Sequence, residues 1–208
     1  MVNERAQMAT DQEIELKREI GVAESQGYAA ASIELTERLL KIAPDSPYYK
    51  YLYGENLRVV GRCRQAEQVL LEIDIELIPQ ERKHLVALQL GQLYQAMGLF
   101  AQAEAQYKRA TELNPHITDT WILFGNFLMQ CDRFPDAIDS LRRGLQAAGN
   151  LDEVHINLGD CYRAQRLYEQ ARQHYLQALD IDPNYTDGRK KLNDVVAAMD
   201  VAKGSYGI

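Results

Sequence analysis

Apolar and polar residues follow one another along this chain with the three-to-four-residue period of amphipathic α-helices. No segment sustains the period-two alternation that is typical of a half-buried β-strand. Glycine or proline interrupts the helical pattern at regular intervals, which indicates turns between short helices. The pattern therefore predicts an all-α protein built from many short helices.

Three series of residues recur along the chain, each with successive spacings of 37, 34 and 34 residues. They are Gly54, Gly91, Gly125 and Gly159; Ala66, Ala103, Ala137 and Ala171; and Leu57, Tyr94, Leu128 and Tyr162. A glycine in one helix and an alanine twelve residues later, in the next helix, are small enough to let the two helices cross closely. The bulky residue three positions after the glycine would fill the neighbouring space on the same face. The series predict a row of similar helix pairs.

Prolines and further glycines mark where these helices end. A proline cannot continue a helix and disfavours helical geometry in the residue before it, so each of three prolines is expected to close a second helix. These are Pro44, Pro115 and Pro183. Glycine accepts the left-handed conformation common after a helix, so three glycines are expected in the turns between paired helices. These are Gly27, Gly61 and Gly98.

In these residues the chain resembles the tetratricopeptide repeat, a 34-residue helix-turn-helix unit with the pattern W-x2-L-G-x2-Y…A-x3-F…P. The copy nearest the pattern contains Leu90, Gly91, Tyr94, Gly98, Phe100, Ala103, Tyr107, Ala110 and Pro115. The last full copy contains Leu158, Gly159, Tyr162, Tyr168, Ala171, Tyr175, Ala178 and Pro183. Trp121 stands at the tryptophan position of the copy between them, whereas the opening copy carries Ile20 and Ser32 where glycine and alanine are expected.

The resemblance implies a right-handed α-solenoid of about five helix-turn-helix units and a C-terminal capping helix. The expected units are residues 13–46, 47–83, 84–117, 118–151 and 152–185. The capping helix is expected over 186–202, with Leu192, Val195, Val196 and Met199 on its apolar face. Residues 1–12 are expected to fray, and residues 203–208 to form a flexible tail. The 37-residue spacing places three additional residues near 72–83, as a longer second helix or loop or as a protrusion that a partner contacts.

Charge, apolar runs and cysteines argue against several classes of function and location. A net charge of −7 opposes binding to nucleic acid, which needs many lysine and arginine contacts with phosphate. The N-terminus lacks the apolar stretch of a secretory signal, and the hydrophobic uncharged run of residues 120–131 is too short for insertion into a membrane. Cys63, Cys131 and Cys161 form no C-x-x-C pair, which favours a reducing, cytoplasmic location.

No motif indicates catalysis, so the chain is expected not to be an enzyme and to need no cofactor or metal. The segment Asp180–Asn184 matches the start of a calcium loop, but Tyr185 and Lys191 replace its required glycine and glutamate. His155 stands at a consensus tryptophan position, where packing between helices is favoured over a ligand role. The cysteines lie within predicted helices or beside turns, where a thiol more often packs as a small apolar group than acts as a nucleophile.

In this family the concave face of the first helices is the usual ligand site, so the resemblance implies a peptide-binding groove there. Positions 2, 5, 6, 9, 12 and 13 of each unit are expected to face it. The residues expected in the groove are Tyr48, Tyr51, Glu55, Arg58, Leu88, Gln89, Gln92, Gln95, Ile122, Asn126, Met129, Ile156, Asn157, Asp160 and Arg163, with Leu52, Leu85, Asp119, Leu123 and Glu153 beside them. Tyr51, Leu88, Ile122 and Ile156 share position 5, and would form an apolar stripe or, alternatively, pack against neighbouring helices.

The expected partner is therefore another protein, held through apolar anchors and through amides such as Gln89 and Asn126 that can bond a peptide backbone. The two-carboxylate clamp that some relatives use for acidic chaperone tails is not expected. Asn126, Asn157 and Lys191 fit that clamp, but Ile122 and Asp187 replace its basic residues. Besides an adaptor or scaffold, three alternatives stay open: a dedicated secretion or assembly chaperone, a regulatory subunit of an enzyme complex, and self-association into a homo-oligomer.

Overall fold

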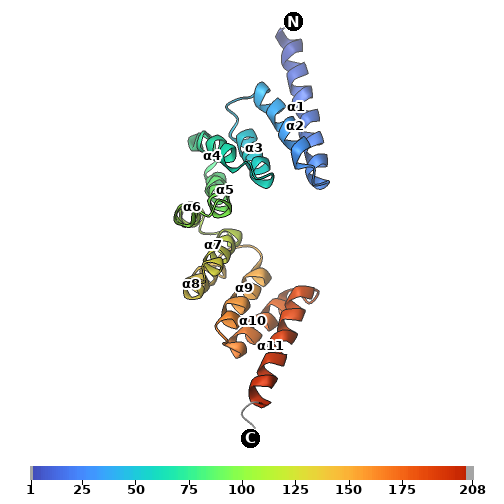
Figure 1. Ribbon diagram of the computed structural model, residues 1–208. Coiled ribbons are helices and arrows are strands. Elements are labelled where there is room, and N and C mark those ends of the chain that lie inside the picture. The colour runs from blue at the N-terminus through green and yellow to red at the C-terminus, as the bar shows by residue number, and fades with distance from the viewer. Residues whose placement is uncertain (1, 205–208) are drawn as a thin grey trace. The chain divides into compact units, whose positions relative to one another are not determined.

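A computed structural model describes residues 2–204 of the chain, and the side chains of residues 11–23 and 25–201 (Figure 1). This part of the chain forms eleven α-helices, two short 3-10 helices and no β-strand, which confirms the all-α prediction. The α-helices are α1 (Val2–Ser25), α2 (Ala29–Ile42), α3 (Pro47–Val59), α4 (Cys63–Leu71), α5 (Lys83–Ala96), α6 (Phe100–Leu113), α7 (Thr118–Gln130), α8 (Phe134–Gly144), α9 (Leu151–Ala164), α10 (Tyr168–Ile181) and α11 (Thr186–Gly204). The 3-10 helices are η1 (Ile75–Leu77) and η2 (Gln80–Arg82).

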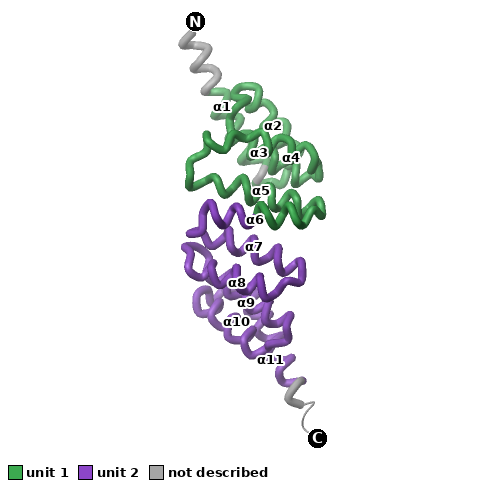
Figure 2. Tube along the Cα trace, turned by 90° about the vertical axis from the view of Figure 1, so that its left-hand side faces the viewer, with its two compact units in different colours: residues 1–106 green, residues 107–208 purple. Residues whose placement is uncertain are grey.

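The chain divides into two compact units, residues 1–106 (unit 1) and residues 107–208 (unit 2), and the division falls within α6 (Figure 2). Within unit 1, each helix from α1 to α5 packs against the next, and α3 also contacts α5. Within unit 2, each helix from α7 to α11 packs against the next, and α7 also contacts α9. In both units, first helices of successive pairs therefore lie side by side and form one face.

Three of the four repeated glycines allow a close crossing between the helices of their pairs. A β-carbon added to Gly54 would lie 2.6 Å from a Cδ atom of Leu70, and one added to Gly125 would lie 2.8 Å from Cγ of Leu141. At Gly159 the added atom would collide with the ring of Tyr175. The nearest partner is thus the residue sixteen positions after the glycine, rather than the alanine twelve positions after it as expected. The alanines are fully buried, so they still contribute small volume to the core.

The turns within the helix pairs use the left-handed backbone conformation. The three glycines expected there have φ values of +72° at Gly27, +78° at Gly61 and +73° at Gly98, which confirms the prediction. The last two pairs have Asp132 at φ 57° and Arg166 at φ 60° in the equivalent turns. These two residues continue the glycine series at the 34-residue spacing. Arginine gives no signal of such a turn, and aspartate, although enriched in this conformation, is a weaker signal than glycine.

The predicted helix ends agree with the structure at the prolines and differ at the chain start. Pro44, Pro115 and Pro183 each lie two residues beyond the end of α2, α6 and α10, respectively. At its other end the chain is already helical from Val2, although fraying was expected up to residue 12. Of the expected tail, residues 205–208 lie outside the described residues.

The last helix covers the apolar side of the last pair, as expected of a cap. Val195 is 1% exposed and belongs to a core cluster with Tyr175 and Ala178 of α10. Leu192 and Met199 pack against this cluster, whereas Val196, expected on the same face, stays 38% exposed. Three of the four predicted positions therefore face the core.

The three additional residues lengthen a connection rather than a helix. The second helix of the pair, α4, ends at Leu71, and residues 72–82 lead to α5 through η1 and η2. The Nζ atom of Lys50 donates a hydrogen bond of 3.1 Å to the carbonyl oxygen of Glu72. An ion pair of 3.0 Å joins Nζ of Lys83 to Oε2 of Glu76. We call residues 72–82 the inserted segment. These contacts hold its first residue against α3 and η1 against the start of α5.

Candidate functional site

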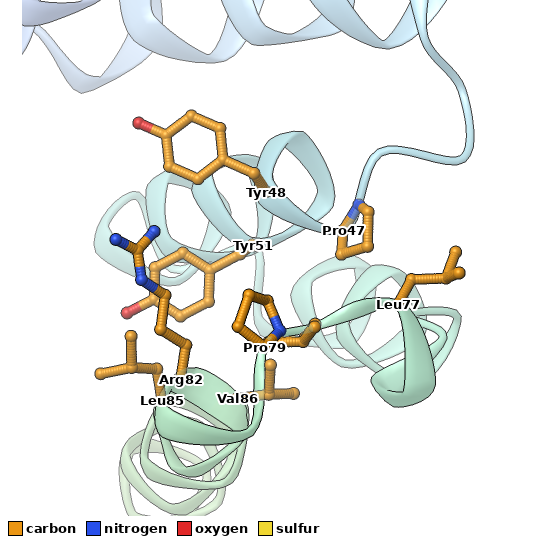
Figure 3. Close-up of a pocket in the computed structure, with 9 residues that line it drawn as sticks. Pro47, Tyr48, Tyr51, Leu77, Pro79, Arg82, Leu85 and Val86 are labelled. Carbon is orange, nitrogen blue, oxygen red and sulfur yellow. The ribbon is translucent and has the colours of Figure 1, made fainter.

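The structure encloses an apolar pocket within unit 1, between the start of α3, the start of α5 and the inserted segment (Figure 3). Its volume is about 250 Å³. The residues that line it are Pro47, Tyr48, Tyr51, Leu77, Ile78, Pro79, Arg82, Leu85 and Val86. Tyr48, at 55%, and Leu77, at 61%, are exposed apolar side chains of the lining, so part of the pocket wall faces solvent. An incoming side chain could bury this apolar surface.

The local sequence explains the walls of this pocket. Ser46 caps α3 by accepting a hydrogen bond from the backbone N–H of Tyr49. Pro47 occupies the first turn of the helix, where a backbone N–H would have no partner within the helix and its absence costs nothing. Tyr48 and Tyr51 then lie three residues apart on one helical face. On the opposite side, Pro79 holds the inserted segment extended before η2. The pocket walls are therefore fixed by a capped helix and a proline-restrained connection.

Tyr51 forms the deepest aromatic part of the wall. Burial raises the pKa of its phenol to about 12, with a further contribution from the nearby carboxylate of Glu55 and an opposing one from Arg58. The hydroxyl thus stays protonated at neutral pH and can donate a hydrogen bond. The carbonyl oxygen of Tyr51 accepts a bond of 3.1 Å from the side-chain amide of Gln89, which ties α3 to α5 beneath the pocket.

Gln89 and Leu88 lie inside unit 1 rather than on a binding surface. They are 2% and 8% exposed, so the expected role of their side chains in contacting a ligand does not agree with their burial. Gln92, Gln95, Glu55 and Arg58 keep intermediate exposure along the same face. Of the residues expected in the groove of unit 1, Tyr48 is therefore the exposed one, and Tyr51 keeps intermediate exposure like these four.

In unit 2 the expected apolar stripe is closed. Ile122 and Ile156 are 3% and 2% exposed. They pack in the interior, which agrees with the alternative that the stripe packs against neighbouring helices. Of their neighbours, Asn126 is exposed and Met129 has intermediate exposure. Asn157 is also intermediate, but its Nδ2 atom is buried and finds no hydrogen-bond partner among the described residues.

In the last repeat, the polar side chains on this face bond to one another. Asp160 accepts a hydrogen bond of 2.7 Å from the hydroxyl of Tyr175 and pairs with Nζ of Lys191 at 2.6 Å. The guanidinium of Arg163 lies 3.7 Å from the same carboxylate, and Asp187 lies 3.0 Å from Lys191. Because its oxygens are already engaged, Asp160 holds α9 to α10 and α11 instead of offering a free carboxylate.

Two histidines meet between α9 and α10. Nδ1 of His155 lies 3.1 Å from Nδ1 of His174, and the ring of His174 stacks on Tyr162 with 5.3 Å between centroids. Burial lowers the pKa of both imidazoles, that of His174 to about 4, with His155 and Arg142 adding to the shift. Both rings are therefore neutral at pH 7. The contacts agree with the expected packing role of His155 and give that role to His174 as well.

The structure also bears on a reactive thiol, a metal site and a membrane-spanning helix. Cys161 is fully buried, and burial raises the pKa of its thiol to about 12, which opposes a nucleophilic role. Within the described part of the chain, no three histidine, cysteine, aspartate or glutamate side chains come together as metal ligands. No helix in that part is both long enough and apolar enough to cross a membrane.

Sequence reasoning predicted some of the pocket and missed the rest. Tyr48, Tyr51 and Leu85 come from the expected face of the first helices. The inserted segment supplies Leu77, Ile78, Pro79 and Arg82, which lie outside the repeat pattern. The available signal was the altered spacing together with an Ile-Pro dipeptide inside an otherwise charged stretch.

Comparison with known proteins agrees with the repeat geometry. One tetratricopeptide repeat family model matches residues 153–185, and a second matches residues 88–152. The chain is a tetratricopeptide repeat protein. A thermophilic tetratricopeptide repeat protein of Thermus thermophilus has the same fold, with a TM-score of 0.69, 20% identity, and coverage of 89% of this chain and 99% of that one. The first such domain of Spaghetti (RPAP3), bound to the HSP90 peptide SRMEEVD, has a TM-score of 0.53 and 18% identity over 57% of this chain and 94% of that one.

Relatives by sequence are much larger proteins. Anaphase-promoting complex subunit 7 of Dictyostelium discoideum is 34% identical over 77 residues, which are 37% of this chain and 13% of that protein. A tetratricopeptide repeat protein 30 homolog of Aedes aegypti is 26% identical over 141 residues, 65% of this chain and 20% of that protein. The chain thus spans a fifth or less of these relatives. Tetratricopeptide repeats form protein–protein interaction modules, and proteins built from them are generally non-enzymatic scaffolds.

Proposed function

We propose that this tetratricopeptide repeat protein is a non-enzymatic adaptor that binds a peptide or helical segment of a partner protein. In this proposal the pocket of unit 1 holds the partner's main apolar anchor. The observation that carries the proposal is the open apolar pocket beside Tyr48 and Tyr51, with a 61% exposed leucine, Leu77, at its edge. Pockets of roughly 300–1,000 Å³ hold a drug-sized molecule, so about 250 Å³ suits one side chain better than a whole small ligand.

The remaining positions of the first-helix faces support binding in a secondary way. Gln92 in unit 1 and Asn126 in unit 2 offer amides that can both donate to and accept from a peptide backbone. The Spaghetti (RPAP3) domain binds a peptide that ends in acidic residues, but the basic residues of a two-carboxylate clamp are incomplete here. Lys191, which would fit such a clamp, pairs with Asp160 and Asp187. The proposal therefore places the anchor in the unit 1 pocket.

A selection of displayed random peptides on the full chain tests the proposal. We expect selected peptides to bind with micromolar Kd in fluorescence anisotropy, because ordering a flexible segment offsets part of the apolar gain. Replacing Leu77 with serine should weaken binding by about 1–2 kcal/mol, or five- to thirtyfold, since the anchor loses apolar contact.

Leu71 provides a matched control for this experiment. It is a leucine with the same 61% exposure as Leu77, but it ends α4 and does not line the pocket. Leu71→Ser should therefore leave peptide affinity unchanged. Equal losses in the two variants, or no peptide recovered by the selection, would contradict the proposed function.

A further inference from the structure

The pocket of unit 1 contains a single charged residue, Arg82, among nine lining residues. The guanidinium extends along the side of the pocket where the ring of Tyr51 lies (Figure 3). Arg82 is exposed, and among the described residues no acidic side chain pairs with it. An uncommitted guanidinium at the edge of an apolar pocket is a recognition element for an incoming anion.

The other cations around the inserted segment are already engaged. Lys50 donates to the carbonyl oxygen of Glu72, and Lys83 pairs with Glu76. Both lysines therefore hold the segment in place, whereas the charge of Arg82 has no such structural use. Glu55 and Arg58 both lie near the phenol of Tyr51, and they shift its pKa in opposite directions. The inserted segment also carries Glu72, Asp74, Glu76 and Glu81, but Arg82 is the charged residue that lines the pocket itself.

We infer that the pocket binds a partner segment in which a bulky apolar residue is directly followed by an aspartate or glutamate. The apolar side chain fills the pocket between Tyr48, Leu77 and Val86, and the carboxylate pairs with the guanidinium of Arg82. This inference rests on the proposed function and adds the chemistry of the ligand to it. The site comes from the inserted segment, so it lies outside the residues that the regular repeat supplies.

Matched peptides test the carboxylate directly. The probes are Ac-Ala-Phe-Asp-Ala-NH2 and Ac-Ala-Phe-Asn-Ala-NH2, which differ in charge and hardly in shape. In ¹⁵N-HSQC titrations of the full chain, both should shift amide signals of residues 47–51 and 77–86. The aspartate peptide should bind two- to fivefold more tightly, which is the range expected of an exposed ion pair.

Substitution of the guanidinium completes the test. Arg82→Gln should abolish the preference for the aspartate peptide, and Arg64→Gln, at an exposed arginine of α4, should preserve it. Equal affinities for the two peptides in the wild-type chain, or a preference that survives in Arg82→Gln, would overturn the inference and leave the apolar anchor of the proposed function standing. No shifts in these segments would also overturn it, and the Leu77→Ser comparison then decides the proposed function independently.

A second copy of this chain is the other occupant to distinguish. Sedimentation velocity of the NMR samples is expected to give a monomer with and without peptide. A dimer that dissociates as peptide binds would assign the pocket to self-association and would overturn the inference.

Discussion

Tyr51 in unit 1 and Ile156 in unit 2 occupy the same position of their repeats, yet one lines an open pocket and the other is buried. The difference lies in the connection to the next first helix. In unit 2, residues 182–185 join α10 to α11, and Gly188 brings α11 close to Ile156. In unit 1 the inserted segment is longer, and Val86 stands where Gly188 stands in the last repeat. The longer connection thus leaves space that the short one closes.

The largest effect on this difference between the units is expected when Gly188 is replaced by a residue with a side chain. A β-carbon at this position would lie 2.8 Å from Cδ1 of Ile156 and 3.3 Å from Cδ1 of Tyr185. Gly188→Val should therefore destabilise unit 2 by about 2–3 kcal/mol through overpacking. Urea denaturation followed by fluorescence measures this, because the chain's single tryptophan, Trp121, lies in unit 2.

Gly21 is the control for that substitution. It is exposed in α1, and a β-carbon there would meet nothing within 4 Å, so Gly21→Val should change stability by less than about 0.5 kcal/mol. Peptide affinity should be unchanged in Gly188→Val wherever the chain remains folded. An undiminished urea midpoint for Gly188→Val would show that close approach of α11 is not what closes unit 2.

Acid should destabilise unit 2 through its histidine pair, whereas unit 1 has one buried histidine, His84, whose pKa burial also lowers. Burial holds the pKa of His155 below its ordinary value and that of His174 at about 4, so the native state binds fewer protons than the unfolded chain. This contribution to stability is present above about pH 6.5 and is lost as the pH falls toward 4. With partial solvation of both rings, the expected loss is about 1 kcal/mol between pH 7 and pH 5.

The same tryptophan signal at several pH values measures this loss. His174→Gln should flatten the pH dependence, whereas His116→Gln, at an exposed histidine, should leave it as in the wild type. A pH dependence that is unaltered by His174→Gln would assign the acid sensitivity to other groups.

The smallest expected effect concerns the thiols. Cys161 is 0% exposed with its pKa raised to about 12, whereas Cys63 and Cys131 are partly exposed. At pH 8, Ellman's reagent should therefore modify two thiols of the native chain quickly and the third only after denaturation. Mass spectrometry should find Cys161 unmodified in the native protein; rapid labelling of Cys161 would mean that unit 2 opens readily.

The regular part of this architecture could be predicted from the sequence because its causes are local. Gly61 lies in a left-handed turn that favours glycine, and Pro183 follows a helix that proline cannot continue. In both cases the residue type itself predicts the local structure. Arg166 adopts the same left-handed turn without such a signal, and Asp132 with a weaker one, since aspartate favours this conformation less than glycine does. For those two residues the rest of the repeat fixes the backbone, which a single residue type cannot show.

The candidate site was harder to predict because it depends on contacts between distant segments. Helical geometry alone placed Tyr51, Leu88 and Ile156 on one face. Their different burial arises from the following connection, which is short before Gly188 and long before Val86. The inserted segment was visible as a change of spacing, but its apolar residues could be assigned to a pocket only after η1 and η2 were placed.

Hydrogen exchange of the full chain, with and without a selected peptide, tests the central claim most directly. Because a bound segment protects the backbone amides that it covers, we expect slower exchange in residues 47–52 and 75–86 of unit 1. Residues 119–129 and 153–163 of unit 2 should exchange at unchanged rates. Protection confined to those unit 2 residues, with none around the inserted segment, would contradict the account.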